Sequence, residues 1–135
     1  MNLVERLMAV DSKKISEIET KTIPSKQLSR LTGQKEMITI QAIDGDLFGS
    51  LSASGLDNDG EVDYGRAYST NAKIVAAGVI EPNLKDDALV KHVGAATPAD
   101  AAKALFKGEV NKIAAEISKL SGFESEEDTE EKVKN

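Results

Sequence analysis

The sequence contains no cysteine and no tryptophan, and its only histidine is His92. Without cysteine the chain forms no disulfide framework and has no thiolate nucleophile. One histidine cannot build a histidine-based metal cluster, and the sequence contains no phosphate-binding glycine loop and no nucleophile elbow. We therefore predict a protein that is not an enzyme, with no catalytic residues, no metal site and no cofactor, and we assign His92 a structural role at the end of a short helix.

Long hydrophobic runs are also missing, since no apolar stretch approaches the roughly 20 residues that span a bilayer. The first residues lack the basic region and apolar run of a secretory signal. We therefore expect a cytoplasmic protein without membrane contact. Aromatic residues are scarce as well, and the five present are Phe48, Tyr64, Tyr68, Phe106 and Phe123. The core is therefore predicted to consist mostly of alanine, valine, isoleucine and leucine.

Basic residues are not in excess, because 17 lysines and arginines face 23 acids and the net charge is −6. Residues 124–135 contain six acids and two lysines, which leaves 17 acids and 15 bases for residues 1–123. Nucleic-acid binding requires clustered lysine and arginine, so this balance argues against it. Residues 124–135 are too charged and too poor in apolar residues to fold, and we predict a flexible acidic tail.

One loop invites a calcium-binding interpretation, because residues 57–63 contain several carboxylates around Gly60. Aligning Gly60 with the invariant glycine of an EF-hand places Gly55 at the first ligand position and Arg66 at the twelfth. A cation at the position of the bidentate glutamate opposes calcium binding. We therefore interpret the segment as a solvated loop.

Two strands are predicted in the first third of the chain, at residues 19–23 and 37–43. In the second strand, Ile38, Ile40 and Ala42 alternate with Thr39 and Gln41, which indicates one buried face. A hairpin of about residues 18–43 is marginal alone and needs helices packed on that face.

Helices are predicted from about residue 63 to 121. Tyr64, Tyr68, Ala72 and Val75 follow helical spacing between residues 63 and 77. A short helix is expected at residues 86–93, another after Thr97-Pro98, which ends at Gly108, and a last one over residues 109–120. The fold class is therefore α+β, with an N-terminal hairpin-like sheet packed on a helical C-terminal half. Residues 1–123 are predicted to form a single domain.

Residues 1–10 form a short amphipathic segment, with Leu3 and Leu7 four positions apart. We expect this segment to dock on the rest of the domain.

The last predicted helix is the strongest candidate for a functional surface. Its apolar stripe and the aromatic residue that follows it comprise Val110, Ile113, Ile117, Leu120 and Phe123. Beside a flexible acidic tail, such a helical face suits transient binding of apolar or helical segments of another chain. Ordinary core packing of the stripe is the competing interpretation. We predict that these five residues bind a partner.

Several short motifs occur in a fixed order along the chain: Ile23-Pro24-Ser25-Lys26, Ala76-Ala77-Gly78-Val79-Ile80-Glu81-Pro82-Asn83-Leu84, Val93-Gly94-Ala95-Ala96-Thr97-Pro98, Gly108-Glu109-Val110 and Ile117-Ser118-Lys119-Leu120-Ser121-Gly122-Phe123. An acidic tail that ends in Lys134-Asn135 follows them. In this order and spacing the chain resembles the tail assembly chaperones of contractile-tailed phages and of prophage-like elements in Gram-positive bacteria. The likeness is strongest over residues 72–135.

The resemblance implies a non-enzymatic helper in tail morphogenesis. Such proteins bind the long, largely helical tape measure protein and keep it soluble until tail tube subunits polymerise around it. They act in the host cytoplasm, are generally absent from the finished particle, and often have a second, C-terminally extended product. Tail tube subunits and a second copy of the chain are further candidate partners. A structural tail component, such as a terminator or baseplate protein, is the alternative function.

Overall fold

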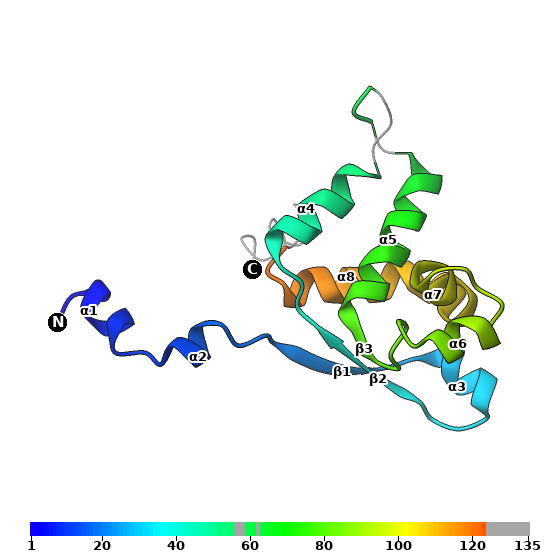
Figure 1. Cartoon of the computed structure of the whole chain (residues 1–135), viewed down its shortest axis with the longest axis horizontal. Helices are drawn as coiled ribbons and strands as arrows, with labels where there is room; N and C mark the ends of the chain where they lie inside the picture. The colour runs from blue at the N-terminus through cyan, green and yellow to red at the C-terminus, as the bar shows by residue number, and fades with distance from the viewer. Residues whose placement is uncertain (56–58, 62, 124–135) are drawn as a thin grey trace, which may run out of the picture.

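The computed structural model describes residues 1–55, 59–61 and 63–123 (Figure 1). Its first half contains α1 (Leu3–Met8), α2 (Ser12–Ile15), β1 (Thr20–Pro24), α3 (Lys26–Thr32), β2 (Met37–Gln41) and α4 (Gly45–Ala53). Its second half contains α5 (Tyr64–Gly78), β3 (Val79–Glu81), α6 (Asp87–His92), α7 (Pro98–Phe106), the 3-10 turn η1 (Lys107–Glu109) and α8 (Val110–Leu120). The α+β class predicted from the sequence is confirmed, whereas the predicted acidic tail lies outside the described residues.

The sheet has three antiparallel strands in the order β1-β2-β3. In the central strand Ile38 and Ile40 are fully buried, as the alternation of apolar and polar residues predicts. The N-terminal pair β1–β2 is the expected hairpin-like unit, with Ile23 opposite Ile38. The third strand, β3, was not predicted, because three residues directly after a helix carry no recognisable strand pattern.

The helices α5, α7 and α8 lie together against the sheet and enclose one hydrophobic core (Figure 1). Phe106 and Ile117 are among its largest fully buried side chains. A Cβ atom added to Gly78 would lie only 2.6 Å from Cδ1 of Ile117, so the end of α5 approaches α8 as closely as glycine allows. This close approach fixes α8 with its apolar stripe facing inward.

The start of α7 follows the predicted capping pattern. The Thr97 hydroxyl accepts a hydrogen bond from the backbone N–H of Asp100, and Pro98 opens the helix. The predicted end of this helix at Gly108 is wrong, because α7 ends at Phe106 and the residue with positive φ, at 50°, is Lys107. The phenol of Tyr68 donates a hydrogen bond to the Lys107 carbonyl at 3.1 Å, and η1 continues directly into α8.

Two helices go beyond the prediction. Residues 45–53 form nine residues of helix, with Asp44 as N-cap. The segment after Pro24, which joins the two predicted strands, contains α3. Its N-cap is the buried Ser25, whose hydroxyl donates a hydrogen bond to the Glu109 carboxylate. The backbone N–H groups of Lys26 and Gln27 also donate to that carboxylate, at 3.1 and 2.8 Å. A charge distant in sequence therefore completes the start of α3.

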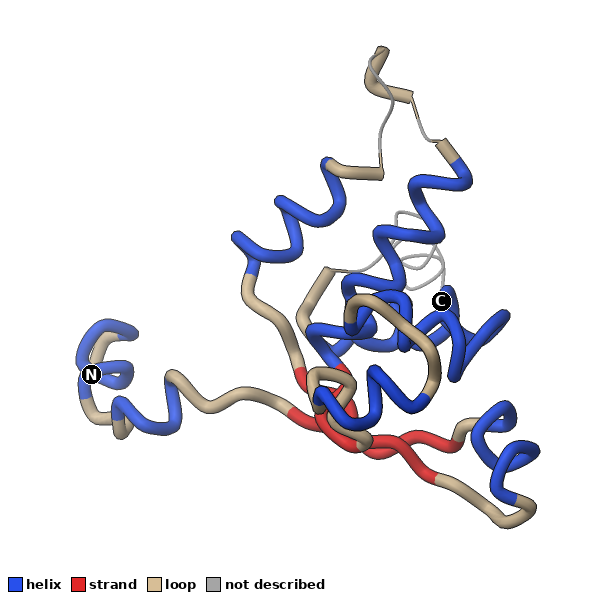
Figure 2. The backbone as a smooth tube through the Cα atoms, turned by 45° about the vertical axis from the view of Figure 1, so that its right-hand side comes forward, coloured by secondary structure: helices blue, strands red, loops and turns tan. Residues whose placement is uncertain are grey.

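The N-terminal segment differs most from expectation. Residues 1–18, here called the arm, extend away from the rest of the described chain, here called the body (Figures 1 and 2). No residue of α1 or α2 is buried, and Leu3 and Leu7 are 61% and 52% exposed. The expected docking of residues 1–10 on the body is therefore wrong in this structure. Among the residues that the structure describes, none covers the apolar side of α1.

Candidate partner-binding site

The structure divides the five predicted partner-binding residues into two sets. Val110, Ile113 and Ile117 lie in the core with at most 2% exposure, because their side of α8 packs against α5 and the sheet. They are not available to a partner at the surface of the described chain. This corrects the predicted face, and core packing is the right interpretation for these three residues. Leu120 and Phe123 lie at the end of α8, where the helix leaves the core.

Phe123 is 37% exposed, and Phe48 and Leu120 are half-buried. These three residues are here called the Phe123 edge. The rings of Phe48 and Phe123 stack with centroids 4.4 Å apart and an interplanar angle of 7°. Gly122 makes the turn that positions the ring, with φ of 90°, and the N–H of Phe123 donates to the Ser118 carbonyl at 2.8 Å. Two stacked aromatic rings thus lie at the surface of a chain that has only five aromatic residues.

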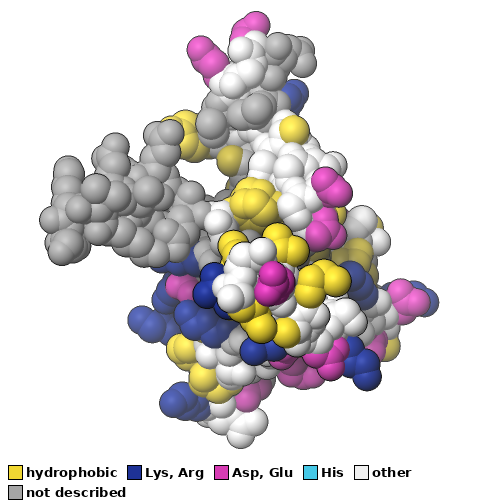
Figure 3. Space-filling model, turned by 90° about the vertical axis from the view of Figure 1, so that its left-hand side faces the viewer, with side chains coloured by type: hydrophobic (Ala, Val, Ile, Leu, Met, Phe, Trp, Pro, Cys, Tyr) yellow, Lys and Arg dark blue, Asp and Glu magenta, His cyan; other side chains and the backbone are white. Residues whose placement is uncertain are grey.

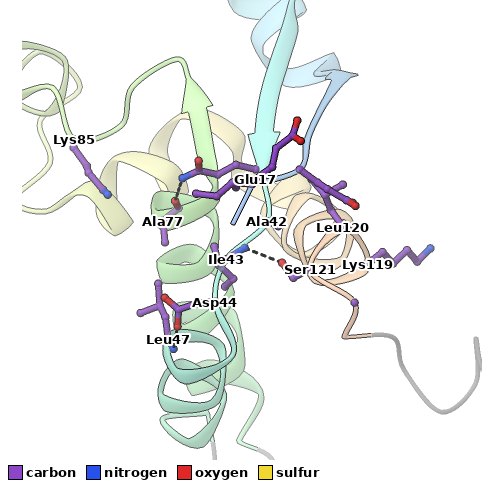
Figure 4. A pocket seen from close by; sticks show the side chains of 14 residues that line it. Glu17, Ala42, Ile43, Asp44, Leu47, Ala77, Lys85, Lys119, Leu120 and Ser121 are labelled. Atoms are coloured by element: carbon purple, nitrogen blue, oxygen red, sulfur yellow. Dashed lines mark hydrogen bonds between the residues drawn. The ribbon is translucent and has the colours of Figure 1, made fainter. Parts of the chain in front are cut away.

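A groove of about 740 Å³ lies next to this edge, where several segments distant in sequence meet (Figure 4). The apolar residues that line it are Ile18, Ala42, Ile43, Leu47, Ala77 and Leu120. Its charged lining comprises Glu17, Glu19, Asp44, Lys85 and Lys119. Because the apolar residues are accompanied by charges of both signs, the groove suits a short amphipathic segment rather than a small molecule held by convergent polar groups.

Side-chain hydrogen bonds fix the walls of the groove. The backbone N–H of Ile43 donates to the Ser121 hydroxyl at 2.9 Å, and that hydroxyl donates to the Ile117 carbonyl at 2.7 Å (Figure 4). The amide of Gln41 donates to the Ala77 carbonyl at 3.4 Å. The end of β2 is thereby tied to the ends of α8 and α5. The groove is built into the fold and does not depend on one loose loop.

The described residues contain no group of three or more histidine, cysteine, aspartate or glutamate side chains that could hold a metal ion. His92 lies in the last turn of α6, as predicted. None of the helices among the described residues is both long and apolar enough to cross a membrane. What the described residues offer at this site is apolar contact surface beside charged side chains.

Comparison with known families identifies the family of this chain. Residues 4–134 match the model of the family described as phage XkdN-like tail assembly chaperone protein. The chain belongs to this family. The family resemblance predicted from the ordered motifs is thereby confirmed, and the protein partners of this tail assembly chaperone are to be sought in tail assembly.

A solved structure supports the fold of the tail assembly chaperone independently. The crystal structure of the protein YqbN superposes with a TM-score of 0.57 at 19% sequence identity. The superposition covers 85% of this chain and 98% of YqbN. No curated protein has significant sequence similarity to this chain.

Sequence reasoning missed the groove of this tail assembly chaperone. Its apolar residues come from the arm, the segment directly after β2, α4, α5 and α8, and none of these segments alone shows a binding pattern. For the arm a signal was available, namely the amphipathic spacing of Leu3 and Leu7. It was interpreted as a docking contact within the chain.

Proposed function

We propose that this chain is a non-enzymatic chaperone of phage or prophage tail morphogenesis that binds the tape measure protein, with tail tube subunits as a second client. It acts in the cytoplasm of the bacterial host and does not remain in the mature virion. The observation that carries the proposal is membership of the tail assembly chaperone family over residues 4–134. The geometry agrees with a binding role, since the described residues present apolar surface and no cluster of metal ligands.

The Phe123 edge is the proposed contact with the client. Phe123 and Leu120 are the two members of the predicted partner-binding set that remain accessible or half-buried, and Phe48 extends them by its stacked ring. Aromatic side chains at a surface bury much area with little loss of conformational entropy, so they are effective anchors for apolar helices. A helical client would place its apolar face on this edge.

The test is co-expression of this chain with the tape measure protein encoded in the same tail gene cluster, followed by co-purification. The variant Phe123→Asp is expected to lose the client while its circular dichroism spectrum stays unchanged, because the substitution places a charge on the apolar contact. The matched control is Leu31→Asp, which changes another exposed leucine on α3, and this control should retain the client. Retention of the client by Phe123→Asp would contradict the proposed contact.

A terminator or baseplate role is separated by mass spectrometry of purified particles. A chaperone is expected to be absent from them. Recovery of this chain at stoichiometric levels in finished tails would replace the proposed chaperone role with a structural one.

A further inference from the structure

The arm exposes an apolar face that the body does not cover. On α1, Leu3, Val4 and Leu7 lie within one helical stripe, and all three side chains are more than half exposed. Figure 3 views the molecule from the side of the arm and shows hydrophobic side chains gathered among charged ones. A six-residue helix is too short to be stable alone in water, because helix nucleation is unfavourable and few hydrogen bonds follow it. The arm therefore has the properties of a segment that acquires its cover by binding.

The same chain also contains a groove whose size fits such a helix. A six-residue helix is about 9 Å long, and the groove of about 740 Å³ can receive the apolar side chains of one such helix. Ala42 and Ala77 are small residues of its lining and leave room for leucine side chains, while Leu47 and Leu120 supply apolar contacts. The uncovered helix α1 and a groove that can accommodate it thus both belong to this chain.

Charge complementarity favours this pairing. Outside its apolar stripe α1 carries Glu5 and Arg6. The lining of the groove carries Lys85 and Lys119, which oppose the charge of Glu5, and acids including Asp44, which oppose the charge of Arg6. The lining of the groove therefore offers charge opposite to each of the two charges of α1.

We propose that α1 of one copy docks through Leu3 and Leu7 into the groove of a second copy. A second copy is favoured over the same chain because Glu17 and Ile18, at the base of the arm, already form part of the groove that belongs to their own body. From that base the arm runs outward (Figure 1), and it would have to reverse its direction to return. Because arm and groove are different surfaces, the contact is heterologous and joins copies head to tail. This inference goes beyond the proposed client binding and does not depend on it.

The experiment measures mass by sedimentation across a wide range of concentration, with three variants of the full chain. The arm variant is Leu3→Ser/Leu7→Ser, and the groove variant is Leu47→Glu. The control is Met37→Ser, which removes an exposed apolar side chain of β2 that lies outside both surfaces. Thermal unfolding is followed for each, because all four substituted residues are exposed and the body should remain folded.

The wild-type chain and Met37→Ser are expected to associate as concentration rises, whereas the arm and groove variants should each lose this association. The decisive sample is their mixture. The arm variant keeps an intact groove and the groove variant keeps an intact arm, so together they should form a one-to-one dimer that grows no further.

Three results would overturn the inference. A wild-type chain that stays monomeric with a protected arm would show docking within one chain. Equal loss of association in Met37→Ser would indicate unspecific hydrophobic contact. A mixture that remains monomeric would show that arm and groove do not pair. None of these results bears on co-purification of the tape measure protein, so the two proposals fail separately.

Discussion

The body and the arm contain similar apolar side chains at helical spacing, yet they differ completely in burial. Ile117 of α8 is 0% exposed, whereas Ile15 of α2 is 66% exposed. Amphipathic spacing is present in α8 and in α1, the other helix of the arm. The difference teaches that periodicity predicts an apolar face on a helix but does not identify what covers it. In α8 the cover is the chain itself, and for the arm we propose a second copy.

The physical basis of the difference lies in what surrounds each helix. Along α8, the stripe meets the sheet and α5, with Gly78 allowing close approach. The arm precedes the edge strand β1, beyond which the sheet has no further strand among the described residues. Its helices have six and four residues, and none of their residues is buried by another element of the described chain.

The comparison is tested most directly by the same substitution in each region. Ile117→Ala should lower the free energy of unfolding by about 2–5 kcal/mol, because it removes buried methyl groups and leaves a cavity in the core. Ile15→Ala should change it by less than about 0.5 kcal/mol, because this side chain is already in water. Urea denaturation followed by circular dichroism at low protein concentration measures both. Equal losses would show that the arm is covered within the monomer.

Much of the body could be predicted from the sequence because its signals are local. The alternation around Ile38 and Ile40 indicated a half-buried strand, and the Thr97-Pro98 pair indicated the start of α7. The spacing from Tyr64 onward predicted α5 nearly to its last residue. In each case the residues that determine the element lie within it or directly beside it.

The features that escaped prediction depend on contacts between distant residues. The start of α3 is completed by Glu109, more than 80 positions away, and β3 exists because its residues pair with β2. Of the candidate site, Phe123 was identified from its position after the last helix, and it is accessible. The burial of Ile113 and its neighbours could not be distinguished from exposure, since a stripe on one helix suits both a core and an interface.

A second test sharpens the contrast by adding one carbon atom at two helical glycines. Gly78→Ala should destabilise the body by about 1–3 kcal/mol, because the new Cβ would overlap the Ile117 side chain, which must move. Gly49→Ala in α4 meets nothing within 4 Å and should stabilise the protein by about 0.4–1 kcal/mol, because alanine restricts the unfolded chain. Both values are measured by urea denaturation. A neutral Gly78→Ala would mean that α5 and α8 separate easily.

The smallest expected change in unfolding free energy comes from a comparison of two glutamates. Glu109 binds the start of α3, whereas Glu116 forms an ion pair at the surface. Glu109→Gln keeps the side-chain shape but faces the N–H groups of Lys26 and Gln27 with at most one acceptor oxygen, so one charge-assisted hydrogen bond is lost. We expect a loss of about 1 kcal/mol in unfolding free energy and faster hydrogen exchange at these two amides.

The matched control for this change is Glu116→Gln, which removes the surface ion pair with Lys21 at 3.1 Å. An exposed ion pair contributes little because both charges are well solvated, so the expected loss is below about 0.5 kcal/mol and the amides of α3 should exchange as before. If both variants lost the same stability and left exchange unchanged, the start of α3 would not depend on Glu109. The Glu109 carboxylate would then bind the start of α3 without stabilising it. Residues 26–32 would have to form a helix because of local interactions that their sequence does not reveal.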